Sequence, residues 1–121
     1  MKHSIQELVG QICHSVDADD DGMTFRLFDG RVFWLGHYQE CCEDVHLEEV
    51  IGDVDDLVCA PIIKAVELTN RGEQEGDLLW TFYEVATIKG TVTIRFCANL
   101  YTDYGVDVGF ELLKTGRRIV A

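Results

Sequence analysis

Residues 23–36 read MTFRLFDGRVFWLG, and this stretch decides the fold. Residues 23–28 and 31–36 are rich in aromatic and aliphatic side chains that favour strands, and only Asp29-Gly30 separates the two runs. An Asp-Gly pair between two such runs is typical of a two-residue type I′ turn. The stretch therefore predicts a β-hairpin.

A second hairpin is predicted further along the chain. Residues 78–87 and 91–98 flank a short turn at residues 88–90, and apolar residues alternate with polar ones in the second run. Alternation with a period of two places the apolar side chains on one face of a strand. Weaker patterns of the same kind predict strands at residues 8–16, 45–48, 62–68 and 106–112.

One short helical element is expected among these strands. Asp53 is placed to cap a turn or two of helix over residues 53–59, with Leu57 and Val58 facing inward, and Pro61 ends it. Residues 69–77 are polar and contain two glycines, so they are expected to form the most mobile loop. The elements together predict an α+β fold: a mostly antiparallel sheet, arranged as a roll or a partly open barrel, with one short helix.

Length and composition predict a single domain over residues 1–121. Hydrophobic residues make up 47 % of the chain, which is enough for one core. Residues 1–4 and 114–121 are expected to fray at the two ends.

The chain is strongly acidic. Its 22 Asp and Glu residues against 10 Lys and Arg give a net charge of −12, which disfavours direct binding to nucleic acid and to anionic membranes. Eight carboxylates and no basic residue occur between Arg31 and Lys64. Such a run often forms a solvated face that aids solubility. The sharper hypothesis is a surface that binds a protein with a basic surface, and the size of the chain also allows a homodimer.

The five cysteines are an odd number, and two of them are adjacent, so a disulfide framework is not expected. The sequence shows no charged leader and no apolar run of membrane-spanning length. These features predict a protein of the reducing cytoplasm whose thiols mostly pack in the core.

Residues 37–46, HYQECCEDVH, hold the densest group of chemically active side chains. His37, Cys41, Cys42 and His46 are candidates for a zinc site, because imidazole and thiolate suit that metal. The spacing is unfavourable, since adjacent side chains point to opposite faces of a strand. The more common alternative is one buried thiol, one semi-exposed thiol and hydrogen-bonded histidines.

The same segment allows a nucleophilic reading, in which Cys41 or Cys42 attacks and His37 is the base. Gln39 or Glu43 would then orient the base or stabilise an oxyanion. Nearby carboxylates would raise the thiol pKa, which argues against this hypothesis.

Two further patterns each allow a functional interpretation and an ordinary structural one. Residues 17–22, DADDDG, copy the first half of a calcium loop, but Phe28 stands where the bidentate Glu is needed, so an acidic hairpin turn is predicted. Trp80 and Tyr83 are candidates to line a pocket for a planar ligand, although aromatic residues more often pack in a core.

No cofactor is expected, because the chain contains no glycine-rich phosphate loop or dinucleotide fingerprint.

Over residues 25–110 the chain resembles a family of small uncharacterised proteins, a domain of unknown function found largely in bacteriophage and prophage genomes. The resemblance rests on five blocks: H-x-Q-x-C-C-E-x-V from residue 37, G-D-x-x-D-L from residue 52, P-I-x-x-A-x-E from residue 61, W-T-F-Y from residue 80 and A-T-I-x-G from residue 86. It implies a place in a bacterial host cytoplasm. It also implies candidate binding positions, namely His37, Gln39, Cys41, Cys42 and Glu43.

These observations predict a phage or prophage accessory protein that acts by binding, with its acidic surface engaging a host protein. Two alternatives remain open. One is a small-ligand sponge with an aromatic-lined pocket, and the other is a thiol- or zinc-dependent enzyme.

Overall fold

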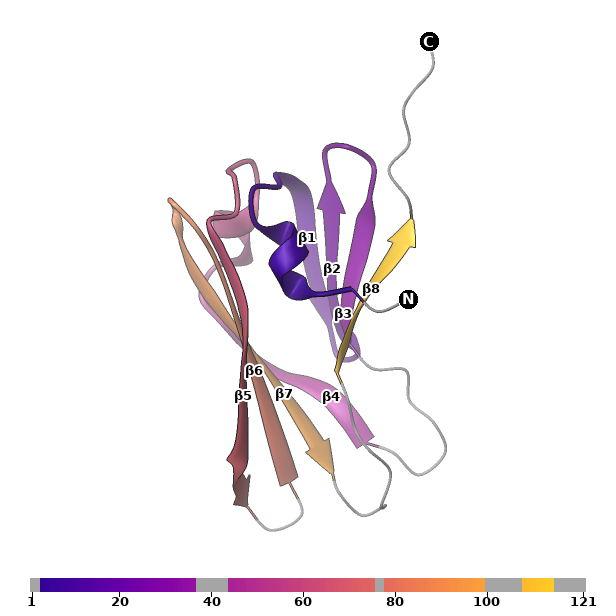
Figure 1. Ribbon diagram of the computed structural model, residues 1–121, viewed down its shortest axis with the longest axis vertical. Helices are drawn as coiled ribbons and strands as arrows, with labels where there is room; N and C mark the ends of the chain where they lie inside the picture. Colours follow the sequence, from indigo (N-terminus) through magenta and orange to yellow (C-terminus); the bar gives the residue numbers. More distant parts are fainter. Residues whose placement is uncertain (1–2, 37–43, 76–77, 100–107, 115–121) are drawn as a thin grey trace.

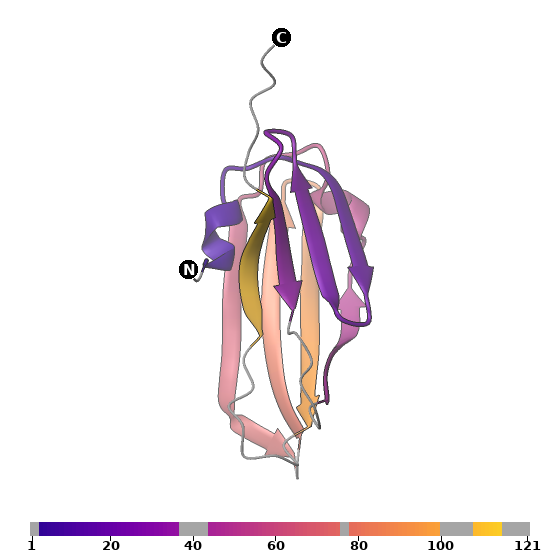
Figure 2. The ribbon, with the colours of Figure 1, turned by 90° about the vertical axis from the view of Figure 1, so that its right-hand side faces the viewer.

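The computed structural model describes residues 3–36, 44–75, 78–99 and 108–114, which form two four-stranded sheets. Sheet I has the strand order β1-β2-β3-β8, and sheet II has the order β4-β7-β6-β5. All neighbouring strands are antiparallel. Figures 1 and 2 show the two sheets stacked as the layers of a β-sandwich.

Sheet I contains β1 (Cys13–Asp19), β2 (Gly22–Leu27), β3 (Val32–Gly36) and β8 (Gly109–Lys114). Sheet II contains β4 (Asp44–Ile51), β5 (Lys64–Glu75), β6 (Leu78–Thr87) and β7 (Gly90–Asn99). Two 3₁₀ turns, η1 (Ile5–Leu8) and η2 (Val54–Leu57), complete the described elements.

The predicted α+β class is wrong, because the described residues contain no α-helix and are nearly all antiparallel sheet. Asp53 does cap the expected element: its side chain accepts a hydrogen bond from the Asp55 amide at 2.9 Å. The element is only a four-residue 3₁₀ turn, since Val58 is already extended and pairs with Cys13. A roll or barrel does not form either, because the strands divide into two separate sheets.

The predicted hairpin at residues 23–36 is present as β2 and β3, but its turn differs. The Leu27 amide donates to the Arg31 carbonyl at 2.9 Å, and the Gly30 amide donates to the Leu27 carbonyl at 3.1 Å. Gly30 has a φ of 95°, whereas the φ of Asp29 is negative. A type I′ turn needs positive φ at both central residues, so this is a three-residue loop ending in a left-handed glycine.

The loop predicted at residues 69–77 is also wrong over most of its length. β5 continues to Glu75 and pairs with the start of β6, with a shift in register between Thr69 and Gln74. The long apolar run of β6 offers pairing partners, and this outweighs the turn propensity of the glycine and polar residues. Residues 76–77 lie outside the described part of the chain.

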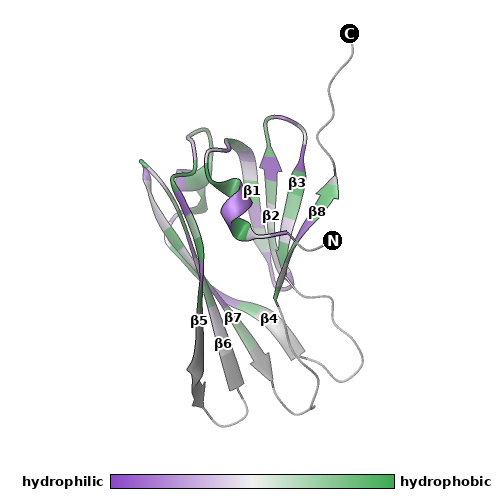
Figure 3. Ribbon diagram, viewed as in Figure 1, coloured by the Kyte–Doolittle hydropathy of each residue, from purple (hydrophilic) through white to green (hydrophobic). Residues whose placement is uncertain are grey.

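The core lies between the two sheets. Phe33 and Phe110 stack with their ring centroids 4.8 Å apart, and Phe25 meets Phe110 edge-on at 6.2 Å. Leu8 of η1 and Leu57 of η2 are fully buried, so both 3₁₀ turns contribute to the same core. Figure 3 shows hydrophobic and hydrophilic residues alternating along the strands, as a sheet with one buried face requires.

The two ends of the chain are partly tied to this framework. His3 donates its amide to the Phe110 carbonyl at 3.3 Å, beside β8. Ser4 caps η1 in a capping box with Glu7. At the other end, Lys114 pairs with Val32 of β3.

A β-bulge in β4 brings the two sheets together at one side. Leu47 pairs with Phe96 and Glu49 pairs with Arg95, so Glu48 is an extra residue between them. At this point the Leu47 amide donates to the Asp20 carbonyl of the β1–β2 turn at 2.9 Å. The contact joins β4, an edge strand of sheet II, to β1, an edge strand of sheet I.

Candidate functional site

The predicted site at residues 37–43 falls outside the described residues. Five of the seven candidate binding residues lie there: His37, Gln39, Cys41, Cys42 and Glu43. Three of these, His37, Cys41 and Cys42, are also candidate metal ligands. His46, the fourth metal candidate, pairs with Cys97 in the backbone ladder, but its side chain is not described. The described residues on either side show only that this segment connects β3 of sheet I to β4 of sheet II.

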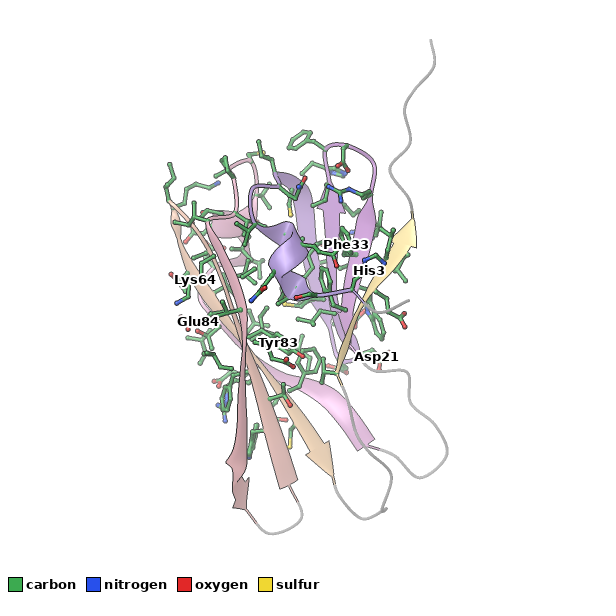
Figure 4. The ribbon with its side chains drawn as sticks, viewed as in Figure 1. His3, Asp21, Phe33, Lys64, Tyr83 and Glu84 are labelled. Atoms are coloured by element: carbon green, nitrogen blue, oxygen red, sulfur yellow. The ribbon has the colours of Figure 1, made fainter. Side chains whose placement is uncertain are left out.

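The other two candidates, Trp80 and Tyr83, lie on opposite faces of β6. Tyr83 is buried between the sheets, where its hydroxyl donates to a Glu67 carboxylate oxygen at 3.0 Å and its ring meets Phe96 edge-on. Figure 4 shows Tyr83 in the space between the sheets. Trp80 packs on the other face, under the Arg95 guanidinium. The structure therefore does not bring these two aromatic residues into one pocket wall.

The face of sheet II that points away from sheet I is called the outer face here. Its centre is Arg95, whose guanidinium carbon lies 4.5 Å from the Trp80 ring centroid and 5.6 Å from that of Phe82. Arg95 also forms an ion pair with Glu49 of β4. A second ion pair joins Lys64 to Glu84 at 3.6 Å, and Figure 4 shows both on the same side of the sheet. Apolar side chains complete the outer face: Ile51, Val66 and Leu68.

Sequence reasoning missed this cluster because it depends on register. Arg95 looks like an ordinary solvent-facing residue of an alternating strand. Only the pairing of Arg95 with Phe82 and of Trp80 with Cys97 shows that the guanidinium lies between two aromatic rings.

An acidic flank runs along the side where β1 and β4 meet. It is defined by seven exposed carboxylates from the β1–β2 hairpin, β4 and the cap and first turn of η2: Asp17, Asp19, Asp20, Asp21, Glu48, Asp53 and Asp55. Among the described residues, Arg26 and Lys89 border it and both are engaged, because Arg26 pairs with Asp17, and Lys89 donates to the carbonyls of Asp55 and Val58. The flank is therefore a strongly negative surface.

The DADDDG motif forms the tip of this flank. Asp19 accepts hydrogen bonds from the amides of Asp21 and Gly22, at 2.9 and 3.0 Å, so its carboxylate closes the β1–β2 turn. The prediction of an acidic hairpin turn is confirmed. Within the described ranges no three His, Cys, Asp or Glu side chains are grouped to hold a metal ion.

Three thiols can be placed in the described structure. Cys13 and Cys97 are buried and Cys59 is exposed. Burial raises the pKa of the Cys13 thiol to about 12, which keeps it protonated and unreactive. Cys13 therefore packs as a core residue, as the sequence predicts for most of the thiols.

One end of the sandwich carries exposed apolar residues on its loops. Phe28, Ile63 and Ile88 are 62 %, 58 % and 83 % exposed, and Val9 and Ile12 lie in the same group of loops. Backbone hydrogen bonds from Phe28 to Ile12 and from Ile63 to Ala86 hold these loops side by side. A large apolar residue in a turn, such as Ile88, is the one sequence signal that could have indicated this end.

The fold and these surfaces define a small acidic β-sandwich protein with three distinct exposed surfaces: the acidic flank, the outer face and the apolar loops at one end. The chain belongs to the family described as Domain of unknown function (DUF7448), whose model matches residues 6–110. Searches of curated proteins and of solved structures found no match to this chain. Among the described residues, no helix has the length and apolar character needed to cross a membrane.

Proposed function

We propose that this protein acts by binding, and that its acidic flank engages a basic surface on a host protein. In this proposal it is an accessory protein of a phage or prophage and works in the bacterial cytoplasm. That context comes from the sequence resemblance described above, which rests on blocks such as H-x-Q-x-C-C-E-x-V from residue 37.

The observation that carries the proposal is the density of carboxylates on the acidic flank. Seven exposed carboxylates lie along one side of the sandwich, and the described cations beside them, Arg26 and Lys89, are already bonded within the chain. A concentrated negative field attracts a positively charged partner and accelerates encounter with it. The same field repels nucleic acid phosphates and anionic lipid, which favours a basic protein as the partner.

The architecture supports this role because hydrogen bonds connect the turn and the strand that carry these carboxylates. The Asp19 carboxylate closes the hairpin turn, and the Leu47–Asp20 hydrogen bond ties that turn to β4. Charges held on connected strands keep a constant pattern, so a partner of matching shape can recognise them with little loss of entropy on binding.

The test is capture from bacterial lysate by three forms of the protein. One form is the natural sequence, one is the triple variant D20N/D21N/D55N on the flank, and the control is E67Q/E84Q/E111Q. Each variant removes three carboxylates, so both have the same net charge. The control residues lie elsewhere. Glu67 is on β5 and Glu111 on β8, the strands farthest from β4 and β1 in their sheets, and Glu84 is on β6, two strands from β4.

Mass spectrometry should show that the natural form and the control capture the same basic proteins and that the flank variant loses them. Capture should weaken as salt rises to about 0.5 M, because exposed charges are then screened. Equal capture by all three forms would show that the flank is not used. Equal loss in both variants would show a response to net charge alone, and either result would overturn the proposal.

A further inference from the structure

We propose that the outer face of sheet II is the contact surface of a homodimer. The proposal is independent of the acidic flank and its partner. It begins from an unusual property of this sheet, which carries aromatic and aliphatic side chains on the side away from the core.

The composition of the outer face is that of a protein interface. The solvent side of an antiparallel sheet usually carries polar residues. Here Ile51 and Leu68 are 50 % and 45 % exposed, and Trp80 and Phe82 are half-buried beside them. Aromatic residues and arginine are the residue types most enriched in protein interfaces, and contiguous apolar patches on a surface mark interaction sites.

Charge favours a second copy of the chain as the occupant. Two copies of net charge −12 repel each other over most of their surfaces. The described charges of the outer face are balanced, however, because Arg95 pairs with Glu49 and Lys64 pairs with Glu84. A basic partner would be drawn to the acidic flank instead. The balanced apolar face suits a partner with an equally neutral apolar face, and a second copy supplies one.

The size of the face is sufficient for a stable dimer. Four strands spaced about 4.8 Å apart give a width of roughly 19 Å, and a strand the length of β6 or β7 gives about 33 Å. The product is roughly 600 Å² of flat sheet for each copy, and the relief of the side chains raises the accessible area towards the ~800 Å² per partner of an ordinary interface.

A symmetric pairing of the two outer faces has a two-fold axis between the faces, parallel to the strands. Such an axis places β4 of each copy over β5 of the other, because these are the two edge strands of sheet II. Glu49 of one copy then lies level with Leu68 of the other, because Glu49, Arg95, Phe82 and Leu68 share one row of the sheet register. The two sheets would pack about 10 Å apart, as the layers of a sandwich do. The β1–β2 turn and η2 stay outside this contact, so a dimer would present two acidic flanks.

Sedimentation of the purified chain at rising concentration tests the proposal, with L68E as the interface variant and I88E as its control. Both changes place a carboxylate on an exposed aliphatic residue, but Ile88 lies in the β6–β7 turn and not on the outer face. The natural chain and I88E should sediment as dimers at about 0.1 mM, and L68E should need at least ~10-fold higher concentration to dimerise. Added salt should strengthen the dimer, because it screens the repulsion between two acidic chains.

A fluorescence measurement avoids dependence on how well L68E folds. The chain contains two tryptophans, so W34F leaves Trp80 as the single reporter on the outer face. Acrylamide quenching of Trp80 should decrease as the concentration of W34F rises through the dimer range. A natural chain that stays monomeric in high salt, equal dissociation of L68E and I88E, or quenching of Trp80 that does not change with concentration would each overturn the proposal.

Discussion

Gly22 of β2 passes so close to Leu35 of β3 that a Cβ atom on Gly22 would lie 2.2 Å from the Leu35 carbonyl oxygen. The obstacle is backbone of a paired strand, so a side chain cannot be accommodated by rotation. Gly22→Ala must push β2 and β3 apart at the open end of the β2–β3 hairpin, where Gly22 pairs with Gly36. We expect a loss of at least about 2 kcal/mol in the free energy of unfolding, measured by urea or thermal denaturation.

Gly10→Ala is the matched control for this prediction. Gly10 has a φ of 86°, but no atom lies within 4 Å of an added Cβ. Its cost is therefore only the left-handed backbone conformation, about 1–2 kcal/mol. A Gly22→Ala protein as stable as Gly10→Ala would show that the two strands lie farther apart than the structure has them.

The stacking of Arg95 on Trp80 and Phe82 predicts that Arg95→Lys destabilises the protein. An ammonium keeps the charge next to Glu49 but loses the planar contact with the rings. Lysine also removes the Arg95 Nε, a buried group without a hydrogen-bond partner, and this offsets part of the lost stacking energy. The expected cost is therefore about 0.5–1 kcal/mol. Arg26→Lys, at an exposed ion pair, should cost less than about 0.5 kcal/mol. Equal effects in chemical denaturation would contradict a role for the stacking.

Differences in burial predict the order in which the described thiols react. Cys59 is exposed, whereas Cys13 and Cys97 are buried and the pKa of Cys13 is raised to about 12. Iodoacetamide at about pH 8 should modify Cys59 in the folded protein and the other two only after unfolding. Peptide mass spectrometry after timed labelling gives the rates. Labelling of Cys13 as fast as Cys59 would show that the core opens readily at β1.

The capping box at the N-terminal end predicts a dependence of stability on pH. The hydrogen bond with the His3 side chain, at 3.1 Å, and that from the Ser4 amide hold the pKa of Glu7 below its usual 4.5. Because the folded pKa is the lower one, the contribution of Glu7 to stability is complete above the unfolded pKa. It is lost as the pH falls through the folded pKa.

Urea denaturation of the natural chain and Glu7→Gln at pH ~6 and at pH ~3 measures this contribution. The variant should be less stable than the natural chain at the higher pH, and the difference should shrink at the lower pH. A difference that is the same at both values would rule out the ionised Glu7 as its source. The comparison between the two proteins removes the effect of the other carboxylates, which titrate in both.

The strand pattern and the hairpins could be predicted from the sequence because apolar alternation and turn residues are local signals. The sequence locates the turn at Asp29-Gly30, but the turn type depends on backbone angles that Asp-Gly pairs can satisfy in more than one way. The sequence also predicts a longer helical element at residues 53–59 than the structure contains. A cap and an inward leucine are compatible with an α-helix, but pairing of Val58 with Cys13 ends the turn after four residues.

The outer face could not be predicted, because its residues come from four strands and meet only through register. Nothing in the local sequence places Arg95 against Trp80 or Glu49. The acidic flank was predicted in part, since Glu48, Asp53 and Asp55 belong to the carboxylate run between Arg31 and Lys64. The contribution of the β1–β2 turn was not predicted, because it depends on how the two sheets are stacked.

The extra residue in β4 also explains how this strand tolerates an irregular sequence. Without the bulge, Leu47 and Val50 would point in opposite directions, yet both pack against the core. Glu48 restores the phase by occupying a place that no residue of β7 matches. Excising Glu48 should leave the ladder with β7 in register and loosen the link to Asp20. Excising Val50 would instead turn the side chains at the end of β4 to the opposite faces of the sheet. If chain length varies within this strand across the family, Glu48 is the point where evolution could add or drop a residue at least cost.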